Sequence, residues 1–225
     1  MTSPQVAYRS VPDPAFLALA AVWTRDQEDV LLGFIWAAYD RMRADMPTID
    51  ARDLERSITE RLEPRIRDVM TGDEPFYIQH GPYERETMAQ PPAQPPQYDL
   101  AFVWSREERI MWPLEAKVLE TPRTLADYVR DVRDQFLSCR YAPFSSGGAM
   151  LGYLLSEEAE DALLNIGTSL GCALKAVPAF PSRPHRVSEH HRVVPVGKNY
   201  PADFRCYHLV LDYRGLARHR TSIRR

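Results

Sequence analysis

The sequence predicts an α/β fold with a mixed central sheet and helices on its faces. Segments with helical periodicity alternate with short apolar segments along most of the chain. The run AMLGYLL (149–155) is continuously apolar, which suits a central strand covered on both faces. Residues 121–140 place their apolar side chains on one helical stripe. With 225 residues, 44% hydrophobic and 26% charged, the chain is expected to form a single domain, residues 1–225.

The amino-terminal residues 13–45 are expected to be a helical addition to this fold. Their apolar side chains recur at three- and four-residue spacing, and the polar stretch TRDQED (24–29) divides them into two helices. The next helix is predicted over DLERSITERLEPRIRDVM (53–70), with Asp50 as the candidate residue that caps its start.

A core of helix, three strands, helix and buried strand is predicted over residues 51–155, followed by a helix/strand extension over residues 156–225. After the first helix, the predicted segments are, in order, the strand FYIQHG (76–81), which PYERETM (82–88) continues after a turn, a proline-rich surface loop (88–97), the strands YDLAFVW (98–104) and RIMWPLEAKVL (109–119), the amphipathic helix (121–140), the buried strand (149–155), a helix (156–175), a strand (204–213) and a basic end (214–225).

Three ionisable residues stand within the two apolar strands around the SREER turn: Asp99, Glu115 and Lys117. Strand side chains alternate between faces, so Glu115 and Lys117 share a face, and hairpin pairing can bring Asp99 beside Glu115. Two close carboxylates repel unless a cation lies between them, and oxygen ligands suit Mg²⁺ or Mn²⁺. Lys117 would then orient the attacking water or help to deprotonate it. Alternatively, Asp99 only begins a strand and Glu115 and Lys117 form an ion pair at an edge.

The pattern Tyr98-Asp99 followed by Glu115-Ala116-Lys117 resembles the signature of the PD-(D/E)XK nuclease superfamily. The core order of that restriction-endonuclease-like fold matches the elements expected over residues 51–155, although Tyr98 stands where the motif usually has proline. The resemblance implies that Asp99, Glu115 and the backbone carbonyl of Ala116 are metal ligands and that Lys117 is the catalytic lysine. It also implies a glutamate from the first core helix.

Helix geometry selects Glu55 as that glutamate, a catalytic residue and metal ligand. At about 100° per residue, Glu55 falls roughly 30° from the centre of the helix's apolar stripe, whereas Glu60 points nearly opposite. The stretch ERSITERL (55–62) also resembles an ExxITxxL pattern of some superfamily members. The alternative is a glutamate that borders solvent beside a core face.

The helix after Lys117 offers residues that support the site. Tyr128, Asp131 and Gln135 lie along one flank of its apolar stripe, and Tyr128 and Gln135 are predicted to support the catalytic residues. Some relatives use a QxxxY motif here, but Gln135 is followed by Tyr141, so the spacing departs from it. Three arginines are placed to bind nucleic-acid phosphates, although a solvated helix face explains them equally well: Arg130, Arg133 and Arg140.

Several other classes of function are disfavoured. A net charge of −3 argues against a generally basic protein that coats nucleic acid. The three cysteines form no CxxC pair, so a disulfide framework is not expected and a reducing cytoplasm fits. The apolar stretch FLALAAVW (16–23) is too short to span a bilayer, so no membrane is expected. HRVSEHHR (185–192) is interpreted as a polar loop and not as a metal cluster, and the chain lacks GxSxG, GxGxxG and GxxxxGK[ST] motifs.

The sequence therefore predicts a Mg²⁺- or Mn²⁺-dependent nuclease that hydrolyses phosphodiester bonds, with DNA as its expected partner. A role in antiviral defence against foreign DNA follows by analogy with bacterial relatives. RNA as the substrate is one alternative. Another is a catalytically silent subunit of the same fold that binds DNA or a partner protein. A homodimer or a multi-component system fits each of these.

Overall fold

The computed structural model describes residues 12–45, 49, 52–87 and 95–215 of the chain. Its helices and strands are, in order, α1 (Pro14–Asp26), α2 (Glu28–Asp45), α3 (Leu54–Val69), β1 (Phe76–His80), β2 (Leu100–Trp104), β3 (Met111–Leu119), α4 (Pro122–Asp131), a π-helical turn (Val132–Phe136), β4 (Gly147–Leu154), α5 (Ala159–Leu170), β5 (Lys175–Ala176), β6 (His185–His191) and β7 (Asp203–Asp212).

The strands form one mixed sheet in the order β1-β2-β3-β4-β7-β6-β5. The β3–β4 and β4–β7 pairs are parallel, and the other pairs are antiparallel. Every residue of β4 is buried, as its continuously apolar sequence predicts for a strand covered on both faces. The predicted α/β class, with a mixed sheet and flanking helices, is confirmed.

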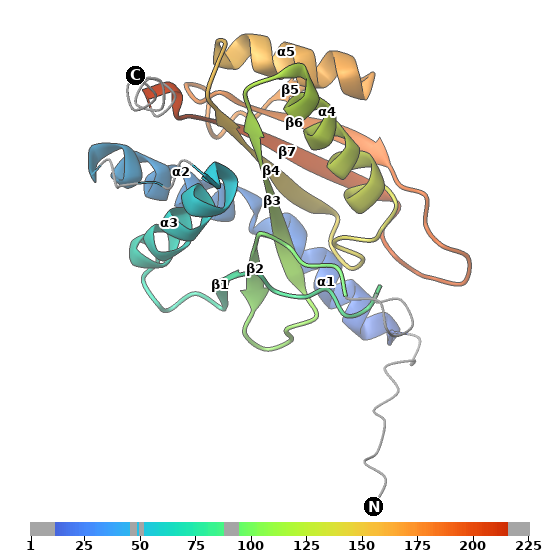
Figure 1. The fold of residues 1–225 in the computed structure, drawn as a ribbon. Coiled ribbons are helices and arrows are strands. Elements are labelled where there is room, and N and C mark those ends of the chain that lie inside the picture. The colour runs from blue at the N-terminus through green and yellow to red at the C-terminus, as the bar shows by residue number, and fades with distance from the viewer. Residues whose placement is uncertain (1–11, 46–48, 50–51, 88–94, 216–225) are drawn as a thin grey trace, which may run out of the picture.

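Helices cover both faces of this sheet (Figure 1). On one face, α1, α2 and α3 pack over an apolar cluster that includes Trp112, Leu114 and Ala116 of β3. On the other face, α4 lies over β3 and α5 lies over β7. Since strand side chains alternate, Glu115 and Lys117 point away from the first cluster and toward the α4 side. The core therefore leaves the two charged residues of β3 on the face where α4 ends.

The amino-terminal helices begin and end close to the predicted positions. Gln27 separates α1 from α2, within the stretch that was expected to divide them. Asp53 caps α3, because its side chain accepts a hydrogen bond from the backbone N–H of Arg56, while the predicted capping residue Asp50 lies outside the described residues. Farther along α3, the Thr59 hydroxyl hydrogen-bonds with the Tyr153 hydroxyl of β4 at 2.9 Å, which joins this helix to the centre of the sheet.

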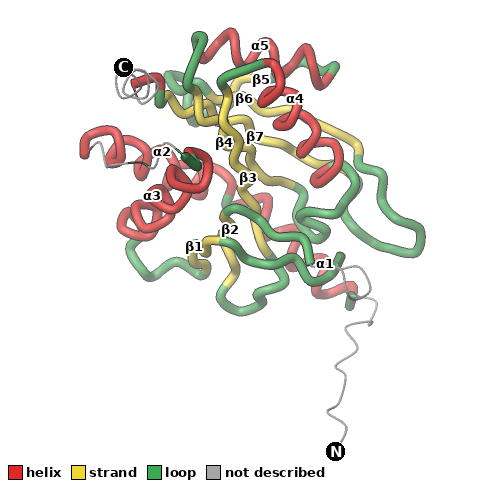
Figure 2. Tube along the Cα trace, viewed as in Figure 1, coloured by secondary structure: helices red, strands yellow, loops and turns green. Residues whose placement is uncertain are grey.

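The segment between β1 and β2 differs from the prediction. PYERETM does not continue β1 as a strand, because its described part forms only an isolated bridge between Tyr83 and Gln97. The described loops on either side of residues 88–94 run alongside each other (Figure 2), because the Tyr98 N–H donates to the Pro82 carbonyl and the Glu84 N–H donates to the Pro96 carbonyl. The described part of the predicted proline-rich loop, residues 95–97, is free of helix, but much of that loop lies outside the described residues.

The carboxyl-terminal third contains a strand that the sequence did not indicate. HRVSEHHR was interpreted as a polar loop, which is wrong, because residues 185–191 form β6 along β7. His185 and Ser188 are buried there, and the Trp36 indole N–H donates to His185 Nδ1. Polar side chains with buried partners can thus occupy a strand whose sequence shows no apolar alternation. The basic end beyond residue 215 lies outside the described residues.

Residues 156–225, expected as an extension, supply β5, β6 and β7, and β7 pairs directly with β4. The division into a core of residues 51–155, the 13–45 addition and this extension stays a prediction. In the described part of the chain, no helix combines the length and the apolar character that crossing a membrane requires.

Candidate active site on the α4 side of β3

The β2–β3 hairpin brings Asp99 and Glu115 together. Leu100 pairs with Leu114 in the antiparallel register, so the next positions outward are Asp99 and Glu115. Asp99 is oriented by a hydrogen bond of 2.7 Å that its Oδ2 accepts from the backbone N–H of Ala116. The register expected from the two apolar strands thus places both carboxylates at one end of the hairpin.

The Lys117 ammonium lies at the centre of the cluster. It is nearly buried, with 18% of its side chain exposed. Its Nζ lies 3.1 Å from Glu55 Oε1, 3.2 Å from Glu115 Oε1, 3.2 Å from Asp131 Oδ2 and 2.9 Å from the Ala116 carbonyl oxygen. Four oxygens from three elements therefore surround one positive charge. The alternative interpretation expected one ion pair, between Glu115 and Lys117, whereas Lys117 pairs with three carboxylates.

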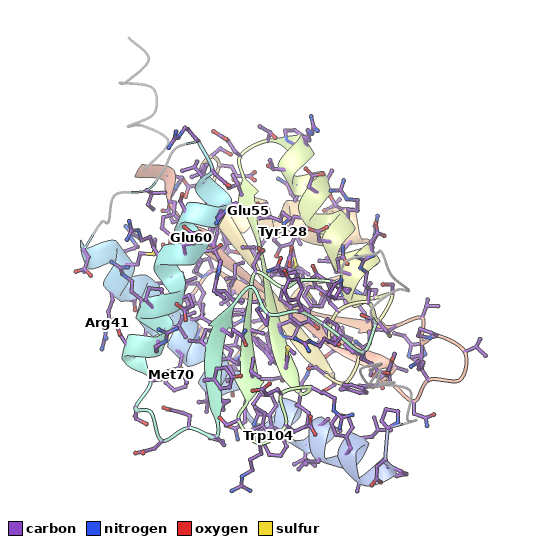
Figure 3. The ribbon with its side chains drawn as sticks, turned by 60° about the horizontal axis from the view of Figure 1, so that its bottom comes forward. Arg41, Glu55, Glu60, Met70, Trp104 and Tyr128 are labelled. Atoms are coloured by element: carbon purple, nitrogen blue, oxygen red, sulfur yellow. The ribbon has the colours of Figure 1, made fainter. Side chains whose placement is uncertain are left out.

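Glu55 comes from the first turn of α3, where that turn approaches the strands (Figure 3). Besides its contact with Lys117, its Oε2 accepts a hydrogen bond of 3.2 Å from the backbone N–H of Val118. Glu60 instead pairs with Arg56 on the exposed side of the same helix, at 2.7 Å. The structure therefore separates the two glutamates as helix geometry predicts, and brings Glu55 to the cluster.

Asp131 is a member of the cluster that the sequence did not assign to it. It is the last residue of α4, it is buried, and its carboxylate forms an ion pair with Lys117. The one available signal was its position on the same helix flank as Tyr128. That flank does not give the distance from α4 to β3, because the distance depends on how the helix packs on the sheet.

Burial and mutual repulsion dominate the electrostatics of these groups. Burial raises the pKa of Glu115 well above its usual range, and the charge of Asp99 raises it further. Burial also raises the pKa of Asp99, although the Ala116 N–H and Lys117 oppose this shift. Burial tends to lower the pKa of Lys117, but the charges of Glu115, Glu55, Asp99 and Asp131 together raise it above its ordinary value. Lys117 is therefore an ammonium ion at neutral pH and is the counter-charge of the cluster.

The donor set has the chemistry of a site for a hard divalent cation. Asp99, Glu115, Glu55 and the Ala116 carbonyl offer only oxygen atoms, which suit Mg²⁺ or Mn²⁺. Glu115 Oε2 is buried and accepts no hydrogen bond, so one carboxylate oxygen lacks the partner that a buried acceptor normally has. A cation would supply that partner and would reduce the repulsion between the carboxylates.

In this structure, however, the oxygen atoms of the site surround the Lys117 ammonium and not a metal position. Over residues 12–45, 49, 52–87 and 95–215, no three His, Cys, Asp or Glu side chains are arranged so that they could hold a metal ion between them. Lys117 Nζ lies among the oxygens that would do so and hydrogen-bonds to the Ala116 carbonyl. A cation could bind these oxygens only if the ammonium moved.

Tyr98, which stands where the nuclease motif usually has proline, anchors the loop that leads to Asp99. It is fully buried, its hydroxyl donates to Glu84 Oε2 at 2.6 Å, and the same oxygen accepts from the Ala142 N–H at 2.9 Å. Its ring packs edge-on against Tyr141, with the centroids 4.7 Å apart. These contacts restrain the residue next to Asp99, a task that proline performs through its fixed φ.

Glu84 is expected to make stability depend on pH. Burial raises its pKa to about 7 from the ordinary 4.5, so between these values the folded chain binds a proton that the unfolded chain releases. This contribution is fully present below the ordinary value and is lost as pH rises to about 7, by roughly 3 kcal/mol. Glu84→Gln should therefore flatten the pH dependence of the free energy of unfolding in urea. Glu108→Gln, at an exposed glutamate, is the control and should leave the slope unchanged; an unchanged slope in Glu84→Gln would contradict the prediction.

No hydrogen bond joins the side chain of Tyr128 or Gln135, the two residues predicted to support the site, to its carboxylates. The Tyr128 hydroxyl hydrogen-bonds with Nδ1 of His208 on β7 at 2.9 Å, and Nε2 of that histidine lies 2.8 Å from Ser188 Oγ. Gln135 lies in the π-helical turn, where its Oε1 is buried without a partner and its backbone carbonyl accepts from the Tyr141 N–H. Tyr128 thus joins α4 to β7 beneath the helix, and a role of either residue in the site stays a prediction.

The contacts of the three arginines expected to bind phosphates are made outside the cluster around Lys117. Arg130 pairs with Asp127 on α4 at 2.7 Å, and Arg133 donates to the Ser169 carbonyl of α5 at 2.6 Å. Arg140 is exposed beyond the π-helical turn. Arg130 and Arg133 line a surface depression between α4 and α5. Their role in binding nucleic acid stays a prediction.

The geometry therefore joins Asp99, Glu115, Lys117 and Glu55, which the sequence selected, to Asp131, which it did not. They come from α3, the β2–β3 hairpin and α4, and they share one buried charge cluster. Comparison of the chain with models of protein families, with curated proteins and with solved structures gave no match.

Proposed function

We propose that this protein is a metal-dependent nuclease with a restriction-endonuclease-like fold, acting on phosphodiester bonds of DNA. The observation that carries the proposal is the convergence of Glu115 and Glu55 on Lys117, with Asp99 held beside them by the Ala116 N–H and one buried oxygen of Glu115 left without a partner. A buried set of carboxylates is costly to fold unless positive charge pairs with it, and Lys117 leaves one buried oxygen of Glu115 without a partner that a bound cation would supply. Strand order supports the fold assignment, because β3 pairs with β2 on one side and with the parallel β4 on the other.

Each residue of the cluster has a role in this proposal. Asp99, Glu115, Glu55 and the Ala116 carbonyl would hold the cation. Bound Mg²⁺ would polarise the scissile phosphate and lower the pKa of the attacking water. Lys117 keeps its proton in this environment and would offset the negative charge that develops on the phosphate.

A surface cavity of about 450 Å³ is the place proposed for a distant part of an extended substrate, since none of the cluster residues lines it. Val103 and Met111, paired across β2 and β3, lie in its wall, as do the exposed Arg85 and Arg106. Val103 follows Asp99 by four residues, so the cavity opens on the same face of the sheet, about 13 Å along the strand. The cavity also carries four glutamates, so binding of a polyanion would depend on individual arginine–phosphate contacts and not on a broad positive field.

The second candidate is a catalytically silent subunit that keeps the fold to bind DNA or a partner protein. The central position of the Lys117 ammonium favours it, because the ammonium already supplies the positive charge that the carboxylates require. In that case the cluster would be a structural ion network and no cation would be needed. RNA as substrate, assembly with itself or with a partner protein, and a role in defence all stay predictions.

The test is incubation of the purified protein with supercoiled plasmid, and separately with single-stranded RNA, in Mg²⁺, in Mn²⁺ and in EDTA. We expect nicked and linear plasmid with either metal and intact plasmid in EDTA. Glu55→Gln should reduce nicking, whereas Glu60→Gln, the same change on the exposed side of α3, should not. A plasmid that shifts on a gel without being cut would support the silent subunit, and cleavage confined to RNA would change the substrate.

A further inference from the structure

The buried Asp131 carboxylate has no task in the site as proposed. Within the described residues its one ion-pair partner is Lys117, at 3.2 Å from Nζ. It comes from α4, whereas the oxygens proposed to hold the cation come from α3 and the β2–β3 hairpin. An acidic group with 13% of its side chain exposed needs a stable partner, and the structure gives it this one.

Lys117 divides its contacts between two groups of oxygens. Glu55, Glu115 and the Ala116 carbonyl belong to the proposed cation site, and Asp131 does not. A divalent cation on the first group would lie close to the ammonium, and two positive charges at such a distance repel strongly in a poorly solvated site. When the cation binds, the ammonium must therefore leave those three oxygens, and Asp131 remains as its partner.

We propose that Asp131 is a positioning residue that holds the Lys117 ammonium beside the site when a divalent cation takes Glu55, Glu115 and the Ala116 carbonyl. The exchange keeps Glu55, Glu115 and Asp131 paired in both states, so neither state leaves one of these three carboxylates without a positive partner. It also keeps Lys117 next to the cation, where the proposed reaction needs it. This inference rests on the proposed function only for the binding of the cation, not for cleavage.

The backbone of α4 has an unusual feature at this position. A capping box formed by Thr121 and Thr124 fixes the start of the helix, and the chain changes to a π-helical turn directly after Asp131. The Leu137 N–H donates to the Val132 carbonyl five residues earlier, at 3.0 Å, which is the wider spacing of a π-helix. π-helical turns are rare and are frequently found at functional sites, so the turn is consistent with a specific task for this end of α4.

Calorimetric titration with MnCl₂ tests the proposal through a double-mutant cycle. Asp131→Asn in the otherwise unchanged chain should weaken Mn²⁺ binding by about tenfold, because the displaced ammonium then has no partner. In a Lys117→Met background, where no ammonium must be displaced, Asp131→Asn should change the affinity by about twofold or less. Asp131→Glu should restore part of the loss. Asp127→Asn, the same change in a partly exposed ion pair of α4 outside the cluster, should have no effect in either background.

Three results would overturn the inference. Equal losses in both backgrounds would make Asp131 a direct ligand of the cation, and no loss in either would show that Lys117 does not need it. Absence of Mn²⁺ binding by the unchanged chain would rule out any exchange. Lys117→Gln provides a second background if Lys117→Met does not fold. The plasmid assay separates the two proposals, since Mn²⁺ binding with the expected coupling but without cleavage would reject the nuclease and keep the exchange.

Discussion

Lys117→Met is expected to lower the free energy of unfolding by about 3 kcal/mol at about pH 8 in the absence of divalent cations. Methionine can follow the path of the lysine stem, but it leaves the buried carboxylates of Glu115 and Asp131 without their counter-charge. Removing one partner of a buried ion pair costs more than the pair itself contributes, because the remaining charge stays desolvated. Urea denaturation followed by circular dichroism measures the change.

The loss should depend on pH and on metal. A carboxylate with a raised pKa is protonated more readily in the folded chain, so its penalty is absent below the ordinary pKa of glutamate and grows as pH rises. Lys117→Met should therefore be close to the unchanged chain in stability near pH 4.5 and clearly weaker at about pH 8. Mg²⁺ or Mn²⁺ should restore part of the stability by binding the folded state.

Lys175→Met is the matched control for this experiment. Lys175 also pairs with a carboxylate, that of Glu189, but both side chains are more than half exposed. Exposed ion pairs contribute about 1 kcal/mol or less, so this variant should lose little stability at any pH. An equal loss in the two variants would show that the cluster around Lys117 is solvated, which would also remove the reason for expecting a bound cation.

Asp99→Asn and Lys117→Met are each expected to reduce the rate of plasmid cleavage by at least about 100-fold. Asp99→Asn keeps the oxygen that accepts from the Ala116 N–H but removes a charge that would attract the cation. Lys117→Met removes the charge that would stabilise the transition state while leaving the carboxylates. The two variants should therefore differ in one respect: raising the Mg²⁺ concentration should rescue Asp99→Asn in part and Lys117→Met not at all.

Tyr128→Phe is a second control, for the predicted supporting role of α4. Tyr128→Phe removes a hydroxyl that bonds His208 and does not contact the cluster. It should reduce stability, because it leaves a buried histidine nitrogen unpaired, and should leave the cleavage rate of the folded protein within about threefold. A rate loss comparable to that of Asp99→Asn would mean that Tyr128 acts on the site itself.

Much of the fold could be predicted from local pattern because the pattern follows directly from which faces are buried. The apolar run of β4 indicated a strand covered on both sides, and the stripe on α4 indicated a helix on the sheet. The failures have physical causes as well. In β6 the buried positions are His185 and Ser188, which lie on opposite faces of the strand and have partners in distant elements, so no alternation of apolar residues appears.

In the candidate site, too, the residues that local sequence pattern selects were predicted, and the residue that depends on the packing of distant elements was not. Asp99, Glu115 and Lys117 could be selected because charged residues inside apolar strands are costly and alternation states which of them share a face. Glu55 could be selected because helix periodicity distinguishes it from Glu60. Asp131 could not be selected, because its contact with Lys117 joins α4 to β3, and the distance between these two elements cannot be read from the sequence of either one.

The sequence by itself determined the order of the elements from α1 to α5, the face on which Glu115 and Lys117 lie, and the choice of Asp99, Glu115, Glu55 and Lys117, but not the strand β6. These features follow from the side-chain periods of about 2 residues in a strand and about 3.6 residues in a helix, which are visible in the sequence. Only the tertiary structure decided that the ammonium of Lys117 occupies the centre of the cluster and that Asp131 joins it. That outcome depends on how α3, α4 and the hairpin pack together, and packing balances the burial of charge against its pairing over the whole molecule.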